Sequence, residues 1–213
     1  MFNHQPLIYR SIRWLFKRLL PRQRYLLITT SLFQLLGRSD IKRWTKRENL
    51  YANWEERTKL MAQWIPDESS VIEFGCGNML LKKYLPQKVQ YTPSDLVRRD
   101  KDTVIIDLNQ KSPLKLPRHN VFFFSGVLEY VYDIERLIQS CLQVSDLLIF
   151  SYTPCDMKTV SRIAQRRSEG WVNDYSKEEI FKLSQDYGLK LLEERIWNNQ
   201  LLLCFQCPNT WSS

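Results

Sequence analysis

The chain has 213 residues, 44% of them hydrophobic, and a formal net charge of +8 at pH 7. This length and hydrophobic content exclude a disordered chain and suit one folded domain with an attached segment better than two domains. The five cysteines are an odd number with irregular spacing and are accompanied by only two histidines. These counts favour reduced thiols over a disulfide framework, and we expect no metal site.

The positive charge is concentrated at the N-terminus. Residues 1–47 contain eleven Lys and Arg residues and one acidic residue, which gives a net charge of +10, whereas residues 48–213 have a net charge of −2. We therefore divide the chain into a basic N-terminal segment, 1–47, and a main domain, 48–213. The chemistry of the main domain should not be inferred from the overall charge.

Two helices are expected in the basic segment. Between Ile12 and Leu20 the apolar residues recur at the spacing of one helix face, and Pro21 ends the pattern. The second, Tyr25 to Leu36, is twelve residues long and carries polar residues, so it is too short and too polar to span a bilayer.

The basic and apolar faces of these helices suit the surface of an anionic membrane or a partner's groove. The helices could equally pack on the main domain with their arginines in water. Nucleic acid is not expected, because no aromatic-rich strand platform accompanies the charge.

Strands and helices alternate in the main domain, which indicates an α/β fold whose mostly parallel sheet is covered on both faces. In its first helix Leu50, Trp54, Arg57 and Met61 share one side. The dipeptide Asn198-Asn199 suits a two-residue turn, so we expect the last two strands to form an antiparallel hairpin. The expected elements are a helix over 49–64, a strand over 70–74, a helix over 79–85, strands over 89–91, 104–106 and 121–125, a helix over 133–143, a strand over 146–152 and a helix from a capping box at 176 to 186.

Polar residues and glycines follow several of these strands. In an open parallel sheet, ligands bind beyond the carboxyl ends of the strands. His119 precedes its strand and so belongs at the opposite edge, which makes it a poor candidate for a catalytic base. The residues at the carboxyl ends are Glu73, Gly75 and Gly77 after the first strand, Asp95 after the second, Asp107 after the third, and Ser125, Gly126 and Glu129 after the fourth.

The stretch VIEFGCGNML, residues 71–80, has the pattern of a strand, a tight turn and a helix start, where a nucleotide-like cofactor can approach the main chain. The dinucleotide fingerprint GxGxxG is incomplete because Leu80 takes the place of the third glycine, so a nicotinamide-dependent oxidoreductase is disfavoured. A cationic or neutral ligand fits better. The Glu73 carboxylate can attract an ammonium or sulfonium group, and Asp95 can accept hydrogen bonds from both ribose hydroxyls.

Four segments, VIEFGCGNML, YTPSDL, VIIDLN and FFFSGVLEYV, in this order and at these spacings, resemble the class I S-adenosylmethionine-dependent methyltransferases. The resemblance covers about residues 50–207. The closing segments GWVNDYSKEEI and IWNNQLLL resemble a bacterial branch of mostly unassigned acceptor. The resemblance implies a Rossmann-like seven-stranded sheet with a C-terminal antiparallel hairpin and S-adenosyl-L-methionine as the cofactor. The reduced thiols favour a place in the cytoplasm, and the basic N-terminal helices suit a peripheral place at the inner membrane surface.

The same resemblance implies roles for individual residues. Met79 stands where the family often has a third glycine, a departure that could narrow the pocket or only replace backbone freedom with packing. Asp107 could instead cap a turn with Asn109, and Cys76 could be a small buried apolar residue. The cofactor-binding residues would be Glu73, Gly75, Cys76, Gly77 and Asn78 at the methionine end, Asp95 and Leu96 at the ribose, Asp107 and Leu108 at the adenine edge, and Ser125 beside the sulfonium.

Methyl transfer to a hydroxyl is helped by a general base. Glu129 and then Asp174 are the favoured candidates among Glu129, Tyr130, Asp156 and Asp174. Glu129 could instead only stabilise a helix start. The segment 153–175 should cover the acceptor, and its arginines could bind a phosphate or carboxylate or simply lie on an exposed helix. We expect a methyltransferase that acts at oxygen on a saccharide, lipid-linked intermediate or small metabolite. The alternative is a non-catalytic methyltransferase-like module that serves as a membrane or assembly partner.

Overall fold

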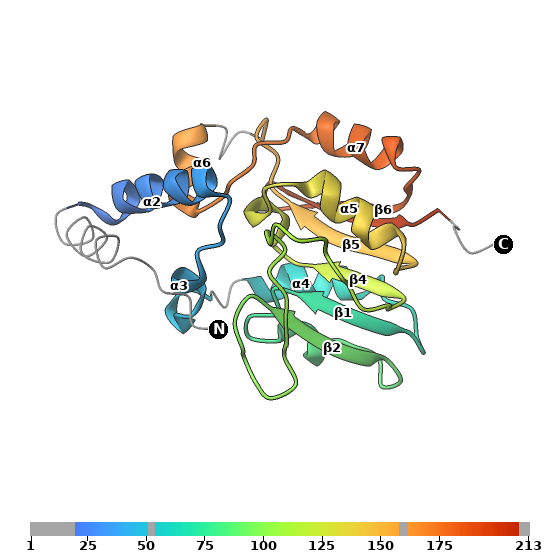
Figure 1. Ribbon diagram of the computed structural model, residues 1–213. Coiled ribbons are helices and arrows are strands. Elements are labelled where there is room, and N and C mark those ends of the chain that lie inside the picture. The colour runs from blue at the N-terminus through green and yellow to red at the C-terminus, as the bar shows by residue number, and fades with distance from the viewer. Residues whose placement is uncertain (1–19, 51–53, 158–161, 209–213) are drawn as a thin grey trace.

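A single seven-stranded sheet forms the centre of the molecule (Figure 1). The computed structural model describes residues 20–50, 54–157 and 162–208. The strand order is β3-β2-β1-β4-β5-β7-β6, and every neighbouring pair is parallel except those that involve β7. The predicted α/β fold with a C-terminal antiparallel hairpin is therefore confirmed. The strands are β1 (Ser70–Phe74), β2 (Gln90–Asp95), β3 (Val104–Ile105), β4 (Val121–Phe124), β5 (Leu147–Tyr152), β6 (Lys190–Trp197) and β7 (Gln200–Gln206).

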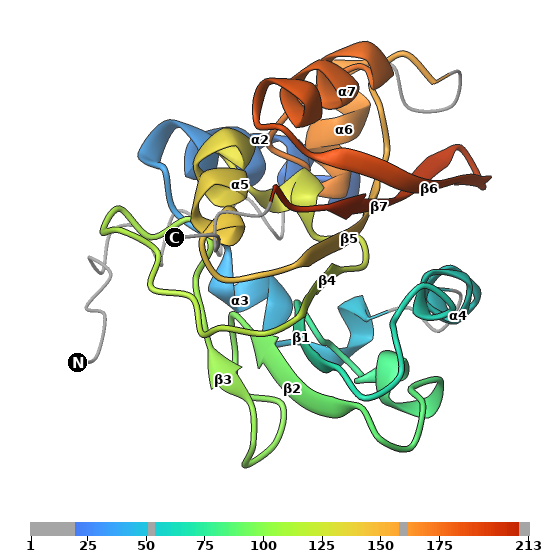
Figure 2. The ribbon, with the colours of Figure 1, turned by 90° about the vertical axis from the view of Figure 1, so that its right-hand side faces the viewer.

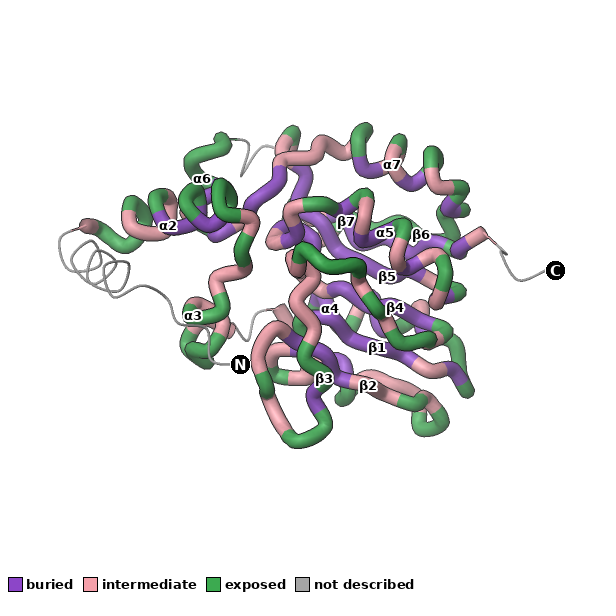
Figure 3. Tube along the Cα trace, viewed as in Figure 1, coloured by how far each residue is buried: buried purple, intermediate pink, exposed green. Residues whose placement is uncertain are grey.

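Helices cover both faces of the sheet (Figure 2). On one face α4 (Glu55–Ala62) buries Met61 against Val71 and Phe123. On the other face α5 (Ile134–Leu142) and α7 (Lys177–Asp186) close a core that includes Phe122 and Phe150. The central strands are buried on both sides, as Figure 3 shows, which is why their sequences are continuously apolar.

Local signals were reliable at the ends of several elements. Ser176 and Glu179 form the capping box that begins α7. Asn198 and Asn199 make the hairpin turn with φ values of 45° and 62°, a conformation that asparagine tolerates. Cys204 packs in the core on one face of the sheet and Cys207 in the core on the other.

Two helix predictions were too long. The segment 79–85 forms only a 3-10 turn, Leu80–Lys83, because Met79 has a left-handed backbone and Pro86 restricts the residue before it. The helix expected over 49–64 is reduced to α4, preceded by a 3-10 turn at Arg47–Asn49. The helix expected between 12 and 20 lies outside the described residues.

The described part of the basic segment packs against the C-terminal half of the main domain. Helix α2 (Arg22–Leu36) lies beside α6 (Ile163–Glu169), and Gln34 donates from Nε2 to the Val172 carbonyl at 2.9 Å. Gly37 ends α2 in the left-handed conformation, and α3 (Ile41–Trp44) follows. Among the described helices, none is long and apolar enough to cross a membrane. The boundary after residue 47 stays a prediction, although residues on both sides of it share one cavity.

Candidate active site

A cavity lies beyond the carboxyl ends of β1, β2 and β4. Most of its wall is formed by two groups of residues, and α4 adds Arg57 and Thr58. One group follows the strands, and we call it the sheet wall. The other, which we call the cover, consists of Thr30, Phe33, Ser39, Asp40, Arg43, Trp44, Gly170 and Val172. All ten residues predicted to bind the cofactor line this cavity, namely Glu73, Gly75, Cys76, Gly77, Asn78, Asp95, Leu96, Asp107, Leu108 and Ser125.

In the turn after β1, every second residue has a left-handed backbone conformation, at three positions in all. Gly75, Gly77 and Met79 have φ values of 65°, 51° and 54°. Met79 thus adopts the conformation that a third glycine would provide, at a cost of about 1–2 kcal/mol. Met79 does not line the cavity. The presence of methionine instead of glycine at this position therefore strains the backbone and does not narrow the pocket.

Glu73 is the most perturbed acid of the sheet wall. Its side chain is 4% exposed and accepts a hydrogen bond from the Tyr91 hydroxyl. Burial raises the pKa of Glu73 to about 8, the Tyr91 hydrogen bond opposes this shift, and the nearby Asp95 adds to it. Burial thus favours the uncharged form of Glu73, and the attraction of a cation by its charge stays a prediction.

Asp95 has no acceptor site to spare. Its Oδ1 accepts from the Val97 amide at 3.1 Å and from Arg99 Nη2 at 3.3 Å. Its Oδ2 accepts from the Gly77 amide at 3.0 Å and from Arg99 Nε at 2.9 Å. These four bonds use the acceptor capacity of the carboxylate, so ribose hydroxyls could bind it only if Arg99 moved away. Arg99 was not predicted at this site, although an acid and an arginine four residues apart in the sequence were a usable signal.

Asp107 makes the local turn that was the alternative to its cofactor role. Its Oδ1 accepts from the Asn109 amide at 2.9 Å and also from Ser39 Oγ at 2.7 Å. Trp44 of α3 packs edge-on against Tyr130, with ring centroids 4.9 Å apart. The cover therefore closes the part of the cavity that was assigned to adenine.

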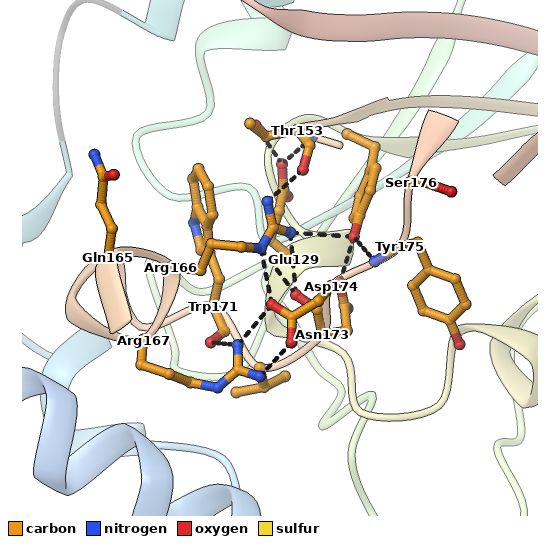
Figure 4. Close-up of polar contacts among 12 residues, drawn as sticks. Glu129, Thr153, Gln165, Arg166, Arg167, Trp171, Asn173, Asp174, Tyr175 and Ser176 are labelled. Carbon is orange, nitrogen blue, oxygen red and sulfur yellow. Dashed lines mark hydrogen bonds and ion pairs between the residues drawn. The ribbon is translucent and has the colours of Figure 1, made fainter. Parts of the chain in front are cut away.

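Neither of the two favoured bases lines the cavity, whereas Tyr130 does. Glu129 is 1% exposed; its Oε1 accepts from the Thr153 amide at 2.9 Å and from Thr153 Oγ1 at 3.1 Å, while Oε2 has no hydrogen-bond partner among the described residues. Asp174 accepts from Arg166 Nε at 2.9 Å and from Arg167 Nη2 at 2.5 Å (Figure 4). The structure gives both carboxylates structural contacts, and a catalytic role for either stays a prediction.

The arginines of the segment 153–175 are largely internal. Arg166 is fully buried, donates to the Thr153 and Asn173 carbonyls, and lies 4.9 Å from the centroid of Trp171 (Figure 4). The burial of Arg166 and Arg167 contradicts the alternative in which these arginines simply lie on an exposed helix, and binding of a phosphate or carboxylate by the cluster stays a prediction. Among the three arginines of this segment only Arg162 is exposed.

Ser125, expected beside the sulfonium, contacts a residue that the sequence analysis did not assign to the site. Its Oγ accepts from Arg57 Nε at 3.0 Å and lies 2.9 Å from Thr58 Oγ1. Both partners come from α4. The signal was present in the sequence, because Arg57 shared the buried side of its helix with Trp54 and Met61.

No protein-family model matches the chain, and no curated protein sequence matches it. Solved structures are similar to it at low sequence identity. The Burkholderia thailandensis 1,6-didemethyltoxoflavin-N1-methyltransferase, with 1,6-didemethyltoxoflavin and S-adenosylhomocysteine bound, has a TM-score of 0.60 at 13% identity, over 90% of this chain and 92% of that chain. The chain has the fold of the S-adenosylmethionine-dependent methyltransferases.

Two other structures show the same methyltransferase fold. A chain of the complex between the Haloferax volcanii Trm112 methyltransferase activator and a methyltransferase has a TM-score of 0.63 at 12% identity, over 81% of this chain and 99% of that chain. The pyocyanin biosynthetic protein PhzM has a TM-score of 0.52 at 12% identity, over 71% of this chain and 54% of that chain. The chain thus spans about half the length of PhzM.

Proposed function

We propose that the chain is an S-adenosylmethionine-dependent methyltransferase with a small-molecule acceptor. The observation that carries this proposal is the convergence of all ten predicted cofactor residues, from four separate strand ends, on one cavity of a methyltransferase fold. When bound, the cofactor would supply an electrophilic methyl group on a sulfonium sulfur. The turn at Gly75 to Gly77 would hold its methionine end, Asp107 and Leu108 its adenine, and Asp95 its ribose after Arg99 has moved.

The acceptor that we propose is a hydroxyl of a saccharide, a lipid-linked intermediate or a small metabolite. Methyl transfer is an in-line displacement, so the main task of the protein is to hold the acceptor atom in line with the methyl group. Ser125 and the cover residues Arg43 and Val172 line the same cavity and could position such an acceptor.

Calorimetric titration with S-adenosylmethionine, S-adenosylhomocysteine and NAD tests this proposal. We expect micromolar binding of the two sulfur compounds and none of NAD. Binding of NAD alone, or no binding of either sulfur compound, would contradict it.

One observation favours the alternative of a non-catalytic module. The four bonds that Asp95 accepts leave no free acceptor for a ribose. The Arg99→Ala variant separates the two proposals. If neither the unchanged protein nor folded Arg99→Ala binds S-adenosylhomocysteine, the non-catalytic module is supported.

We also propose a peripheral contact of α2 with an anionic membrane. Leu35 is 84% exposed, and Ile28 and Leu32 are exposed on the same helix. Arg22 and Arg24 supply positive charge at its start. In a sedimentation assay, the unchanged protein should bind anionic vesicles and the doubly substituted Leu32→Ser, Leu35→Ser variant should not. Neutral vesicles should bind neither protein. Equal binding of both proteins to anionic vesicles would contradict this contact.

A further inference from the structure

Arg57 is a buried cation on the wall of the cavity. It lies in the first turn of α4 and is 3% exposed. All three of its hydrogen bonds go to uncharged acceptors. Nε donates to Ser125 Oγ at 3.0 Å, Nη1 to Gln200 Oε1 at 2.8 Å, and Nη2 to the Ser125 carbonyl at 3.2 Å.

Two of its donors are unused. A guanidinium has five N–H groups, and the three bonds leave one N–H on each Nη without a partner among the described residues. The two Nη groups of a guanidinium form a planar fork that matches the two oxygens of a carboxylate. Trp54 adds only a ring face, whose centroid lies 5.8 Å from the guanidinium carbon.

The other buried arginines of the described chain differ from Arg57 in one respect. Arg99 contacts the Asp95 carboxylate, and Arg166 and Arg167 both contact the Asp174 carboxylate. Arg57 has no carboxylate within ion-pair distance in the described part of the chain. Burial without such a contact is costly for a charged group, and it lowers the pKa of Arg57, an effect that Glu129 and then Tyr130 oppose from a distance.

The position of the guanidinium is fixed by its surroundings. Gly126 lies directly against it, and a Cβ atom at that position would come within 2.4 Å of Nη2. The Gly126 amide is in turn held by Ser151 Oγ at 2.8 Å. Thr58 Oγ1 lies 2.9 Å from Ser125 Oγ, the acceptor of Arg57 Nε. These contacts hold the guanidinium in place before any ligand arrives.

We propose that Arg57 is the anion-binding group of the cavity and pairs with a carboxylate, or a similar small oxyanion, of the bound ligand. This inference rests on the proposed function, because that function offers two sources of the anion. One source is the carboxylate of the methionine part of the cofactor. The other is an acidic group that the acceptor carries in addition to the hydroxyl that is methylated.

Calorimetry on the full chain tests the cofactor as the source. S-adenosylhomocysteine is compared with its analogue that lacks the carboxyl group, for the unchanged protein and for Arg57→Gln. If the cofactor carboxylate binds Arg57, the unchanged protein prefers S-adenosylhomocysteine by about tenfold or more, and Arg57→Gln loses that preference. Arg195→Gln, which changes an arginine of β6 outside the cavity, is the matched control and should keep it.

A second measurement tests the acceptor as the source. Acetate is added to protein saturated with S-adenosylhomocysteine and its binding is observed by saturation-transfer NMR, with neutral acetamide as the matched probe. If the acceptor supplies the anion, acetate gives a signal that acetamide does not, and Arg57→Gln abolishes it.

If Arg57→Gln changes neither the preference for S-adenosylhomocysteine nor the acetate signal, the inference is overturned and the proposed function is unaffected. Failure of the unchanged protein to bind S-adenosylhomocysteine removes the proposed function instead. If the thermal midpoint shows that Arg57→Gln does not fold, Arg57→Lys replaces it in both measurements. Lysine keeps the charge but lacks the two Nη groups, so this variant should keep only part of the preference for S-adenosylhomocysteine or of the acetate signal. An Arg57→Lys protein that behaves like the unchanged protein would contradict paired recognition by the two Nη groups.

Discussion

The sheet wall and the cover of the cavity are held in place in different ways. Gly75 of the sheet wall follows β1, whose last four residues are buried, and Asp95 is the last of the three buried residues that end β2. The cover is held by polar contacts between distant parts of the chain, such as Gln34 to the Val172 carbonyl at 2.9 Å and Ser39 Oγ to Asp107 at 2.7 Å. Because polar contacts contribute about 0.5–1.5 kcal/mol each, the cover should open far more easily than the sheet wall.

The largest expected effect concerns Arg166 of α6, the helix that ends just before the cover residue Gly170. Arg166→Ala removes a fully buried guanidinium and leaves the Asn173 and Thr153 carbonyls without its donors. We expect a loss of about 3–5 kcal/mol in the free energy of unfolding, measured by urea denaturation. Arg162→Ala, an exposed arginine of the same segment, should change it by less than about 0.5 kcal/mol. Equal effects of the two variants would show that the buried network does not stabilise this region.

The next effect concerns the sheet wall and depends on pH. Burial raises the pKa of Glu73 from 4.5 to about 8, so the folded chain keeps a proton that the unfolded chain has released between these values. Stability should therefore fall as pH rises from about 4.5 to about 8, by up to about 1.4 kcal/mol per pH unit, and this contribution should be constant above pH 8. Urea denaturation at several pH values should show this slope in the unchanged protein and a flatter one in Glu73→Gln. Identical slopes would contradict the raised pKa.

Arg99 connects the two walls, because it pairs with Asp95 and donates from Nη1 to the Trp44 carbonyl at 2.9 Å. Arg99→Ala should free two acceptor positions on Asp95 and raise the affinity for S-adenosylhomocysteine by about threefold to tenfold. It should also lower the free energy of unfolding by about 3 kcal/mol, because a buried carboxylate loses its partner. Calorimetry would show the first effect, with Arg195→Gln as the control. A lower affinity in folded Arg99→Ala would show that Arg99 assists the ligand rather than blocking it.

The smallest expected effect concerns the turn of the sheet wall. Met79→Gly removes a side chain from a left-handed position, although glycine also adds entropy to the unfolded chain. We expect a net gain of about 0.5–1 kcal/mol in the free energy of unfolding. Asn198→Gly is the matched control, since asparagine tolerates its φ of 45°, and it should change little. A destabilised Met79→Gly protein would show that the Met79 side chain contributes packing that exceeds the strain.

The predictions that held depend on short stretches of sequence. The strand after Ser70, the capping box at Ser176 and the hairpin turn at Asn198 follow from apolar runs and turn chemistry within a few residues. The helix expected over 79–85 failed because a methionine gives no sign that its backbone is left-handed. In the same way, nothing near Asp174 in the sequence shows that two arginines would bind both of its oxygens.

The sequence by itself determined the order and type of the strands, the concentration of charge at the N-terminus and the set of residues that meet beyond the strand ends. The tertiary structure alone decided the state of those residues. Ser39 and Asp107 are 68 positions apart, and Arg57 and Gln200 are 143 positions apart, so no local pattern predicts their contacts. Burial and hydrogen-bond partners determine whether a carboxylate is charged, occupied or free, and packing of the whole chain determines both.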